Sequence, residues 1–118
     1  MRRFTSLMCL LILQSTAWAG DIAVGDPVFW KEGTRASDGK QEISIATFSF
    51  PSPVRDVQKD FLFLGSGWIH KDDALSVDEA LEYFSTKIKE NPEQAAYFNN
   101  RGRVWVAKNN YTKAVADF

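Results

Sequence analysis

The spacing of hydrophobic residues changes near Leu75, from a two-residue alternation to a helical period. Before Leu75, short apolar runs are separated by turn residues such as Asp38-Gly39. After it, apolar residues recur every three or four positions. Short alternating runs between turns are typical of strands, whereas the later spacing places apolar side chains on one face of a helix. The pattern predicts an α+β protein with a β region at residues 20–75 and helices at residues 76–118.

The predicted strands differ in how clearly the sequence defines them. Residues 42–49 alternate, with Ile43, Ile45 and Thr47 on one face, which predicts a half-buried strand. Pro51 and Pro53 interrupt this pattern, because proline cannot donate a hydrogen bond to a neighbouring strand. The other predicted strands are the runs 28–30, 54–58, 61–64 and 68–70.

Three helices are predicted in the second region. The first, at residues 76–91, begins with a capping box formed by Ser76 and Glu79. A second helix begins at position 93 or 94, and Asn110 is the N-cap of a third helix at residues 111–118.

The helices carry an internal repeat. Ala80, Leu81 and Phe84 recur 34 residues later as Ala114, Val115 and Phe118. This offset is the length of one tetratricopeptide helix–turn–helix unit. The region resembles tetratricopeptide repeats at these core positions: Ala80, Phe84, Pro92, Gly102, Trp105, Ala114 and Phe118.

The resemblance covers about one and a half units, with the last unit incomplete. We therefore expect a truncated chain or the front part of a longer protein. Lys87 and Arg101 depart from the family pattern, which usually has a small residue and an aliphatic residue at these places. Stacked units of this kind build grooves for partners, so the resemblance implies recognition rather than catalysis.

The resemblance also indicates which helix face would bind a partner. The inner wall of a tetratricopeptide array is lined by first helices, which here maps onto Ala96, Asn99, Arg103 and Val106. Asn99 is expected to hydrogen-bond an extended peptide backbone, and Arg103 to pair with a carboxylate. The alternative is that both are ordinary solvated helix residues.

The end of the β region resembles the small Src-homology-3-like barrels of exported bacterial proteins. The resemblance rests on residues 54–64, followed by Gly67-Trp68-Ile69. It implies a small N-terminal β-barrel, and an unrelated β-meander is the alternative. Phe61 and Phe63 would point to one side of their strand and Leu62 and Leu64 to the other, so one face fills the barrel and the other is an apolar outer face. We expect the helix that begins at Ser76 to pack onto that face.

The first nineteen residues have the pattern of a signal peptide. Arg2 and Arg3 precede a short apolar run, and Ala17-Trp18-Ala19 supplies small residues for cleavage before Gly20. The predicted domains are therefore a signal peptide at 1–19, a barrel at 20–75 and helices at 76–118. The protein is expected to be exported to the periplasm, cell surface or medium, contacting the membrane only during export. A buried or membrane-anchored first helix is the alternative.

The residues that could carry chemistry are few. His70 is the only histidine, and the only cysteine, Cys9, lies in the predicted signal peptide. Cysteine-peptidase chemistry needs both groups together, and no serine-nucleophile motif is present. We therefore expect no enzyme activity, metal, cofactor or small-molecule substrate. The 14 basic and 15 acidic residues leave a net charge of −1, which argues against nucleic acid as a partner.

The sequence thus predicts a non-enzymatic protein–protein interaction module of an exported tetratricopeptide repeat protein, with a protein or peptide as its partner. Two alternatives stay open. One is a barrel that binds the cell wall or peptidoglycan, with the helices as a spacer. The other is an N-terminal fragment of a larger protein whose activity lies downstream.

Overall fold

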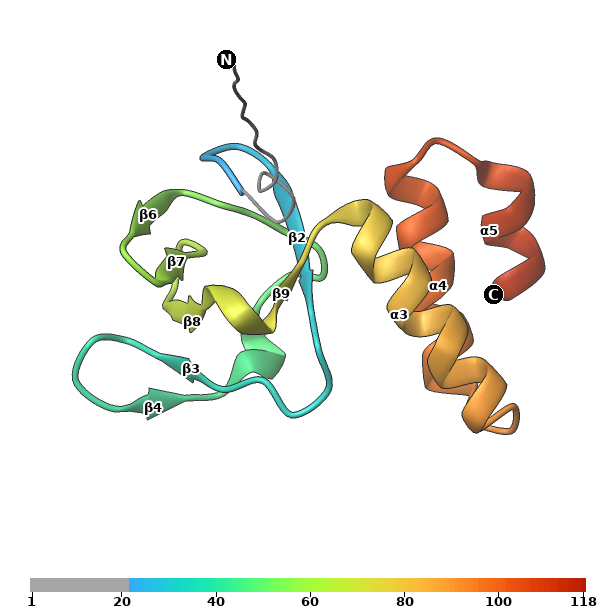
Figure 1. Ribbon diagram of the computed structural model, residues 1–118, viewed down its shortest axis with the longest axis horizontal. Coiled ribbons are helices and arrows are strands. Elements are labelled where there is room, and N and C mark those ends of the chain that lie inside the picture. The colour runs from blue at the N-terminus through green and yellow to red at the C-terminus, as the bar shows by residue number, and fades with distance from the viewer. Residues whose placement is uncertain (1–21) are drawn as a thin grey trace, which may run out of the picture.

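The computed structural model describes residues 22–118, and the predicted signal peptide lies outside this range. A β region occupies one end of the molecule and three helices occupy the other (Figure 1). The predicted α+β class, with a sheet region followed by three helices, is confirmed. Among residues 22–118, no helix is both long and apolar enough to cross a membrane.

The described strands form two antiparallel sheets. One has the order β5-β2-β9 and the other β4-β3-β8-β7-β6. In residues 22–118 no closed barrel is formed, so the predicted closure is not confirmed. The strands are β2 (Pro27–Trp30), β3 (Ala36–Ser37), β4 (Glu42–Ile43), β5 (Ser52–Pro53), β6 (Asp56–Gln58), β7 (Phe61–Phe63), β8 (Trp68–His70) and β9 (Ala74–Leu75).

The predicted tight turns are present. Asp38 accepts hydrogen bonds from the backbone N–H groups of Lys40 and Gln41, at 2.8 and 2.9 Å, and so shapes the turn between β3 and β4. Lys59 has a φ of 53° in the turn between β6 and β7. A positive φ is costly for a residue with a side chain, but it suits a tight hairpin turn.

The predicted strand at residues 42–49 is wrong beyond Ile43. The chain instead forms a short 3₁₀ turn, η2 (Ile45–Thr47). The Ser44 hydroxyl accepts a hydrogen bond from the Ala46 N–H at 3.3 Å. Serine side chains can bind nearby backbone groups in this way, which competes with strand pairing. The strand predicted at residues 54–58 likewise begins only at Asp56.

Strand β2 separates two hydrophobic cores. Val28 packs with the buried residues between the two sheets, whereas Phe29 packs with Leu75 and with residues of the helices. Both side chains have no exposed area. Successive residues of a strand point to opposite faces, so one short strand contributes to both cores. The β region and the helices are thereby joined by apolar packing.

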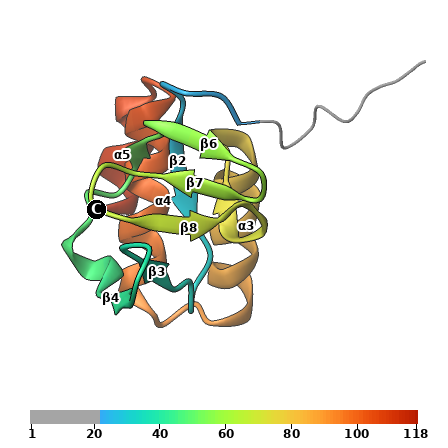
Figure 2. The same cartoon turned by 90° about the vertical axis from the view of Figure 1, so that its left-hand side faces the viewer.

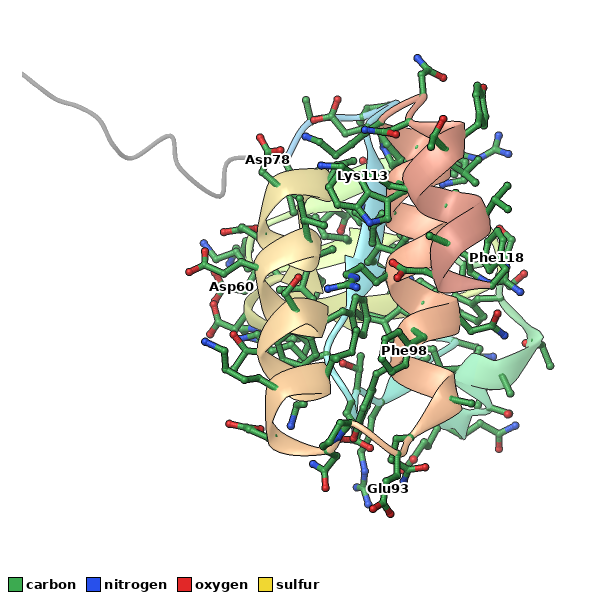
Figure 3. All side chains as sticks on the ribbon, turned by 90° about the vertical axis from the view of Figure 1, so that its right-hand side faces the viewer. Asp60, Asp78, Glu93, Phe98, Lys113 and Phe118 are labelled. Atoms are coloured by element: carbon green, nitrogen blue, oxygen red, sulfur yellow. The ribbon has the colours of Figure 1, made fainter. Side chains whose placement is uncertain are left out.

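The helices are α3 (Val77–Glu90), α4 (Ala95–Ala107) and α5 (Tyr111–Asp117). The capping box at Ser76 is present, and the Asn110 side chain caps α5 by accepting a hydrogen bond from the Lys113 N–H. Helix α4 packs against both α3 and α5 (Figure 3). The predicted helix positions are confirmed to within a few residues.

The expected packing of the first helix on the outer face of the strand at residues 61–64 is wrong. Helix α3 instead lies against β2 and β9, on the other side of the β region from β7 (Figure 1). Phe61 keeps 48% of its surface exposed. Because β9 leads directly into Ser76, α3 begins beside β2, where Phe29 offers an apolar contact.

Candidate functional site

A cleft of about 620 Å³ lies between the β region and α4. One wall is the turn after β2, and a second is the segment from η2 to Pro51. Helix α4 closes the third side. The lining residues from the β region are Trp30, Lys31, Glu32, Gly33, Thr34, Ile45, Ala46, Phe48, Ser49, Phe50 and Pro51, and those from the helices are Phe84, Ala96, Tyr97, Asn100 and Arg103.

Aromatic rings around Phe50 form the apolar part of the cleft. The Phe50 ring centroid lies 4.5 Å from that of Trp30, 5.1 Å from that of Phe29 and 6.1 Å from that of Phe84. Each pair meets edge to face, an arrangement that favours aromatic contacts beyond simple burial. Phe50 therefore fixes the segment before β5 against both β2 and α3.

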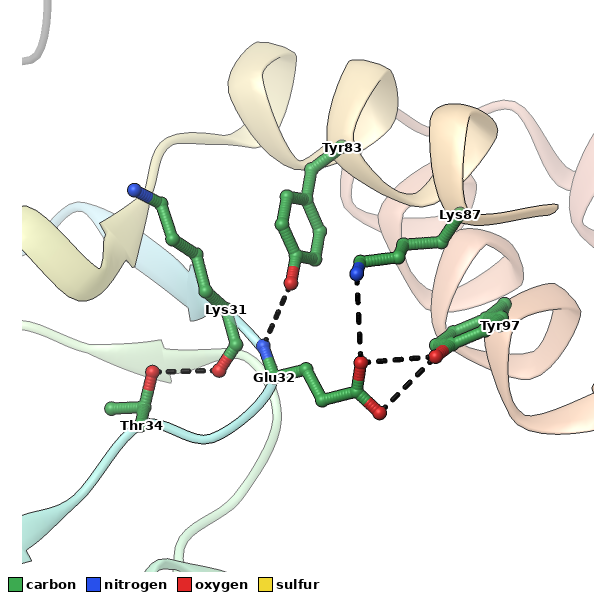
Figure 4. Close-up of polar contacts among 6 residues, drawn as sticks. All are labelled: Lys31, Glu32, Thr34, Tyr83, Lys87 and Tyr97. Carbon is green, nitrogen blue, oxygen red and sulfur yellow. Dashed lines mark hydrogen bonds and ion pairs between the residues drawn. The ribbon is translucent and has the colours of Figure 1, made fainter. Parts of the chain in front are cut away.

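Glu32 connects the turn after β2 to the helices (Figure 4). The Tyr97 hydroxyl donates to its two carboxylate oxygens, at 3.0 and 3.1 Å, and Lys87 Nζ lies 3.6 Å from Oε1. The backbone N–H of Glu32 donates to the Tyr83 hydroxyl at 2.9 Å. We call Glu32, Tyr83, Lys87 and Tyr97 the Glu32 cluster.

The Glu32 cluster changes the acidity of two of its members. The hydrogen bond to the Glu32 carboxylate raises the pKa of the Tyr97 phenol, because it favours the protonated donor. The pKa of the Lys87 ammonium is raised by the Tyr83 oxygen first and by Glu32 as well. The Glu32 carboxylate is thus engaged by one cation and one hydroxyl.

Arg103 bridges α4 and the segment before β5. Its Nη1 donates to the Phe50 carbonyl oxygen at 3.1 Å. Within residues 22–118, neither Arg103 nor Lys31 forms an ion pair with a carboxylate. The Lys31 side chain is directed away from Glu32 and Tyr97 (Figure 4), so the unpaired cation of the cleft is Arg103, and its carboxylate, Glu32, is already engaged by Lys87.

Of the two predicted partner-binding residues, Arg103 and Asn99, the structure places only Arg103 at the cleft. Arg103 and Ala96 line the cleft, whereas Asn99 lies outside its lining and its neighbour Asn100 takes that place. Ala96, Asn100 and Arg103 follow i, i+4, i+7 spacing and so share one helix face. That spacing was the available signal for Asn100. Tyr97 was missed because its partner, Glu32, is 65 residues away.

The predicted repeat-core residues differ in their burial. Four of them are buried: Ala80, Phe84, Gly102 and Ala114. Trp105 is half-buried, and Lys113 Nζ lies over it, 4.6 Å from the ring centroid. A Cβ atom at Gly102 would lie 2.4 Å from Cε1 of Phe118, so α4 and the end of α5 approach closely. Pro92 is exposed in the turn before α4, and Phe118 is 62% exposed.

His70 has a local structural role. It ends β8, and its Nδ1 accepts a hydrogen bond from the Asp72 N–H at 3.1 Å. Over the described range there is no group of three or more His, Cys, Asp or Glu residues arranged to hold a metal ion.

Comparison with known proteins found no relative of this chain. No family model matches the chain, and it has no match among curated proteins or among solved structures.

Proposed function

We propose that the chain is a non-enzymatic protein–protein interaction module that binds an extended acidic peptide in the cleft between the β region and α4. The observation that carries this proposal is Arg103, a cation on the α4 wall of the cleft that is not paired with a carboxylate within residues 22–118. An acidic side chain of a partner would pair with the Arg103 guanidinium.

The lining of the cleft suits a peptide in other ways. Its aromatic and aliphatic residues can bury apolar side chains, while the Asn100 amide both donates and accepts, as a peptide backbone requires. Glu32 would repel an acidic peptide only weakly, because Lys87 lies beside its carboxylate. Binding sites generally combine apolar walls with a few placed polar groups.

We further propose that the helices are of the tetratricopeptide type. In support of this, the N-caps Ser76 and Asn110 are 34 residues apart, and each accepts a hydrogen bond from the third N–H of its helix. Ala80 and Ala114 hold the same place in α3 and α5 and are both buried. The close approach at Gly102 supports the same assignment.

The proposal extends to the β region and to export. Two sheets around a shared core support a small Src-homology-3-like barrel as the N-terminal unit. The basic and apolar pattern of residues 1–19 supports export to the periplasm, cell surface or medium. A partner protein or peptide would then be met outside the cytoplasm.

Fluorescence anisotropy with labelled decapeptide pools tests the peptide proposal. One pool is rich in Asp and Glu, and the other has Lys and Arg at the same positions. The acidic pool should bind more tightly, and Arg103→Glu should weaken its binding by at least about tenfold, which is ~1.4 kcal/mol.

Arg35→Glu is the matched control, because the exposed Arg35 side chain pairs with Glu42 and does not line the cleft, and the charge change is the same. Its binding should stay within about twofold of the wild type. Equal affinity for both pools would contradict the preference for an acidic peptide. Equal losses in the two variants would mean that net charge rather than the cleft governs binding.

A further inference from the structure

The outer face of the larger sheet carries a row of aromatic side chains. In the pairing of β7 with β8, Phe61 lies opposite His70 and Phe63 opposite Trp68. Residues directly opposite each other on antiparallel strands point to the same face, so all four rings share one side. The buried residues Leu62 and Ile69 point to the other side, into the core. Figure 2 shows β6, β7 and β8 at the front of the molecule when it is viewed from this side.

The four rings contact one another in two pairs. The Phe63 and Trp68 centroids are 4.9 Å apart with the rings tilted by 44°, and the Phe61 ring meets the His70 ring edge to face at 5.2 Å. The helices pack on β2 and β9, so they leave this face open. Phe61 is consequently half exposed, although its strand, β7, lies between β8 and β6 in the five-stranded sheet. Exposed aromatic groups of this kind mark interaction sites more often than single exposed residues do.

Polar residues border the rings on both sides. Gln58 lies opposite Phe61 on β6, and Ser37 lies opposite Trp68 on β3, so both share the aromatic face. A hollow of about 560 Å³ is formed on this face by Ser37, Gln58, Lys59, Asp60, Phe61 and Trp68, together with Gly39. The hollow thus offers a hydroxyl, an amide and a carboxylate around an apolar floor.

The charges of the hollow balance. It contains one cation, Lys59, and one carboxylate, Asp60, which also lies 3.4 Å from Lys71 Nζ. A strongly charged ligand would therefore gain little attraction here, in contrast to the cationic cleft at Arg103. The complementary ligand is neutral, has apolar faces to lie on the rings, and has groups that donate as well as accept hydrogen bonds.

We propose that this face binds a neutral saccharide chain. The flat C–H face of a sugar ring matches the aromatic floor, and its hydroxyl groups can donate to Asp60 and both donate to and accept from Ser37 and Gln58. A proline-rich peptide fits less well, because proline has no N–H group and offers Asp60 no hydrogen-bond donor. The site is separate from the peptide cleft and gives the cell-wall alternative a specific location.

Titration of the full chain with two neutral hexasaccharides tests this proposal. The probes are β-1,4-linked hexamers of glucose and of N-acetylglucosamine, with binding followed by calorimetry. At least one hexamer should bind, and Phe61→Ala should weaken that binding by roughly tenfold, because it removes the most exposed ring of the floor. Asp60→Ala should weaken it as well, through loss of the acceptor.

Tyr111→Ala is the matched control, because Tyr111 is also an exposed aromatic residue and lies on α5, far from the β6–β8 face. It should bind saccharide as the wild type does, and Arg103→Glu should too, so that failure here is distinct from failure of the peptide proposal. The proposal is overturned if neither hexamer binds, or if Phe61→Ala binds the hexamer as tightly as the wild type does. It is also overturned if only a polyproline peptide or phosphatidylcholine vesicles bind at Phe61.

Discussion

Two charged residues that depart from the tetratricopeptide pattern both connect neighbouring elements. Lys87 reaches Glu32 in the turn after β2. Arg101 donates to both carboxylate oxygens of Asp117, at 2.7 and 2.9 Å, and its Nη1 donates to the Ser85 hydroxyl at 3.2 Å. Arg101 thus joins α3, α4 and α5. The hydrogen bond with Asp117 raises the pKa of the Arg101 guanidinium, so this group stays charged.

Asp117→Asn should destabilise the protein by about 2 kcal/mol, because the Asp117 side chain is only 8% exposed and its loss leaves Arg101 without a paired anion. Unfolding in urea, followed by circular dichroism, measures this change. Asp78→Asn is the matched control: Asp78 pairs with Lys108 at 2.6 Å but is 85% exposed, so about 0–1 kcal/mol is expected. Equal losses in the two variants would contradict the special role of the Arg101–Asp117 pair.

The residues of the candidate site were only partly predictable. Arg103 was proposed because the resemblance to tetratricopeptide repeats maps their inner wall onto one face of this helix. The opposite wall of the cleft was not found, since it comes from the turn after β2 and from the segment before β5. Arg103 reaches Phe50 across 53 residues, and Tyr97 reaches Glu32 across 65. No local pattern encodes such contacts.

Helices were predicted more accurately than strands, because their ends are fixed by local chemistry. The Ser76 and Glu79 side chains each bond to the other's backbone N–H, and both residues can be read directly from the sequence. The strands depend on distant partners: β5 is only Ser52–Pro53 and exists through its pairing with β2. Pro53 is tolerated in β5 because β5 is an edge strand.

Ser76→Ala should cost about 1 kcal/mol, because it removes the acceptor for the Glu79 N–H at the start of α3. The free energy of unfolding gives the measurement. Thr86→Ala lies on an exposed position inside the same helix and should be neutral or slightly stabilising, since alanine has the higher helix propensity. A free energy of unfolding equal to that of the wild type would show that the capping box contributes little to α3.

The shared strand β2 explains why the β region and the helices form one body. Phe29 of β2 is buried with Leu75 of β9 and with helix residues such as Phe84, and this packing provides the apolar contact. The Glu32 cluster adds polar contacts beside it. The sequence could not show this arrangement, because the run Val28-Phe29-Trp30 is apolar on both sides and does not reveal which side faces the helices.

The Glu32 cluster should make the stability of the whole molecule fall at alkaline pH. The pKa values of Tyr97 and Lys87 are raised above 10.0 and 10.5 on folding. A raised pKa contributes stability that is fully present below the unfolded value and is lost as the pH rises through the folded one. The free energy of unfolding should therefore decrease above about pH 10.

Urea unfolding at a series of pH values measures this decrease, and Tyr97→Phe is the test variant because it removes one of the two titrating groups. Its stability should depend less on pH above about pH 10 than that of the wild type. Tyr111→Phe is the control, since Tyr111 lies outside the cluster and bonds only to Asn109 among the described residues. Identical alkaline profiles for the wild type and Tyr97→Phe would rule out the cluster as the cause.

The most direct measurement of the proposed peptide function is an NMR titration of the full chain with the acidic peptide pool. We expect the largest backbone shift changes at Tyr97, Asn100 and Arg103 on α4 and at residues 31–34 and 45–51 on the facing walls, with little change on β6–β8. Arg103→Glu should remove these changes. Shift changes confined to other surfaces, or an unchanged spectrum at saturating peptide, would contradict the assignment of this cleft as the binding site.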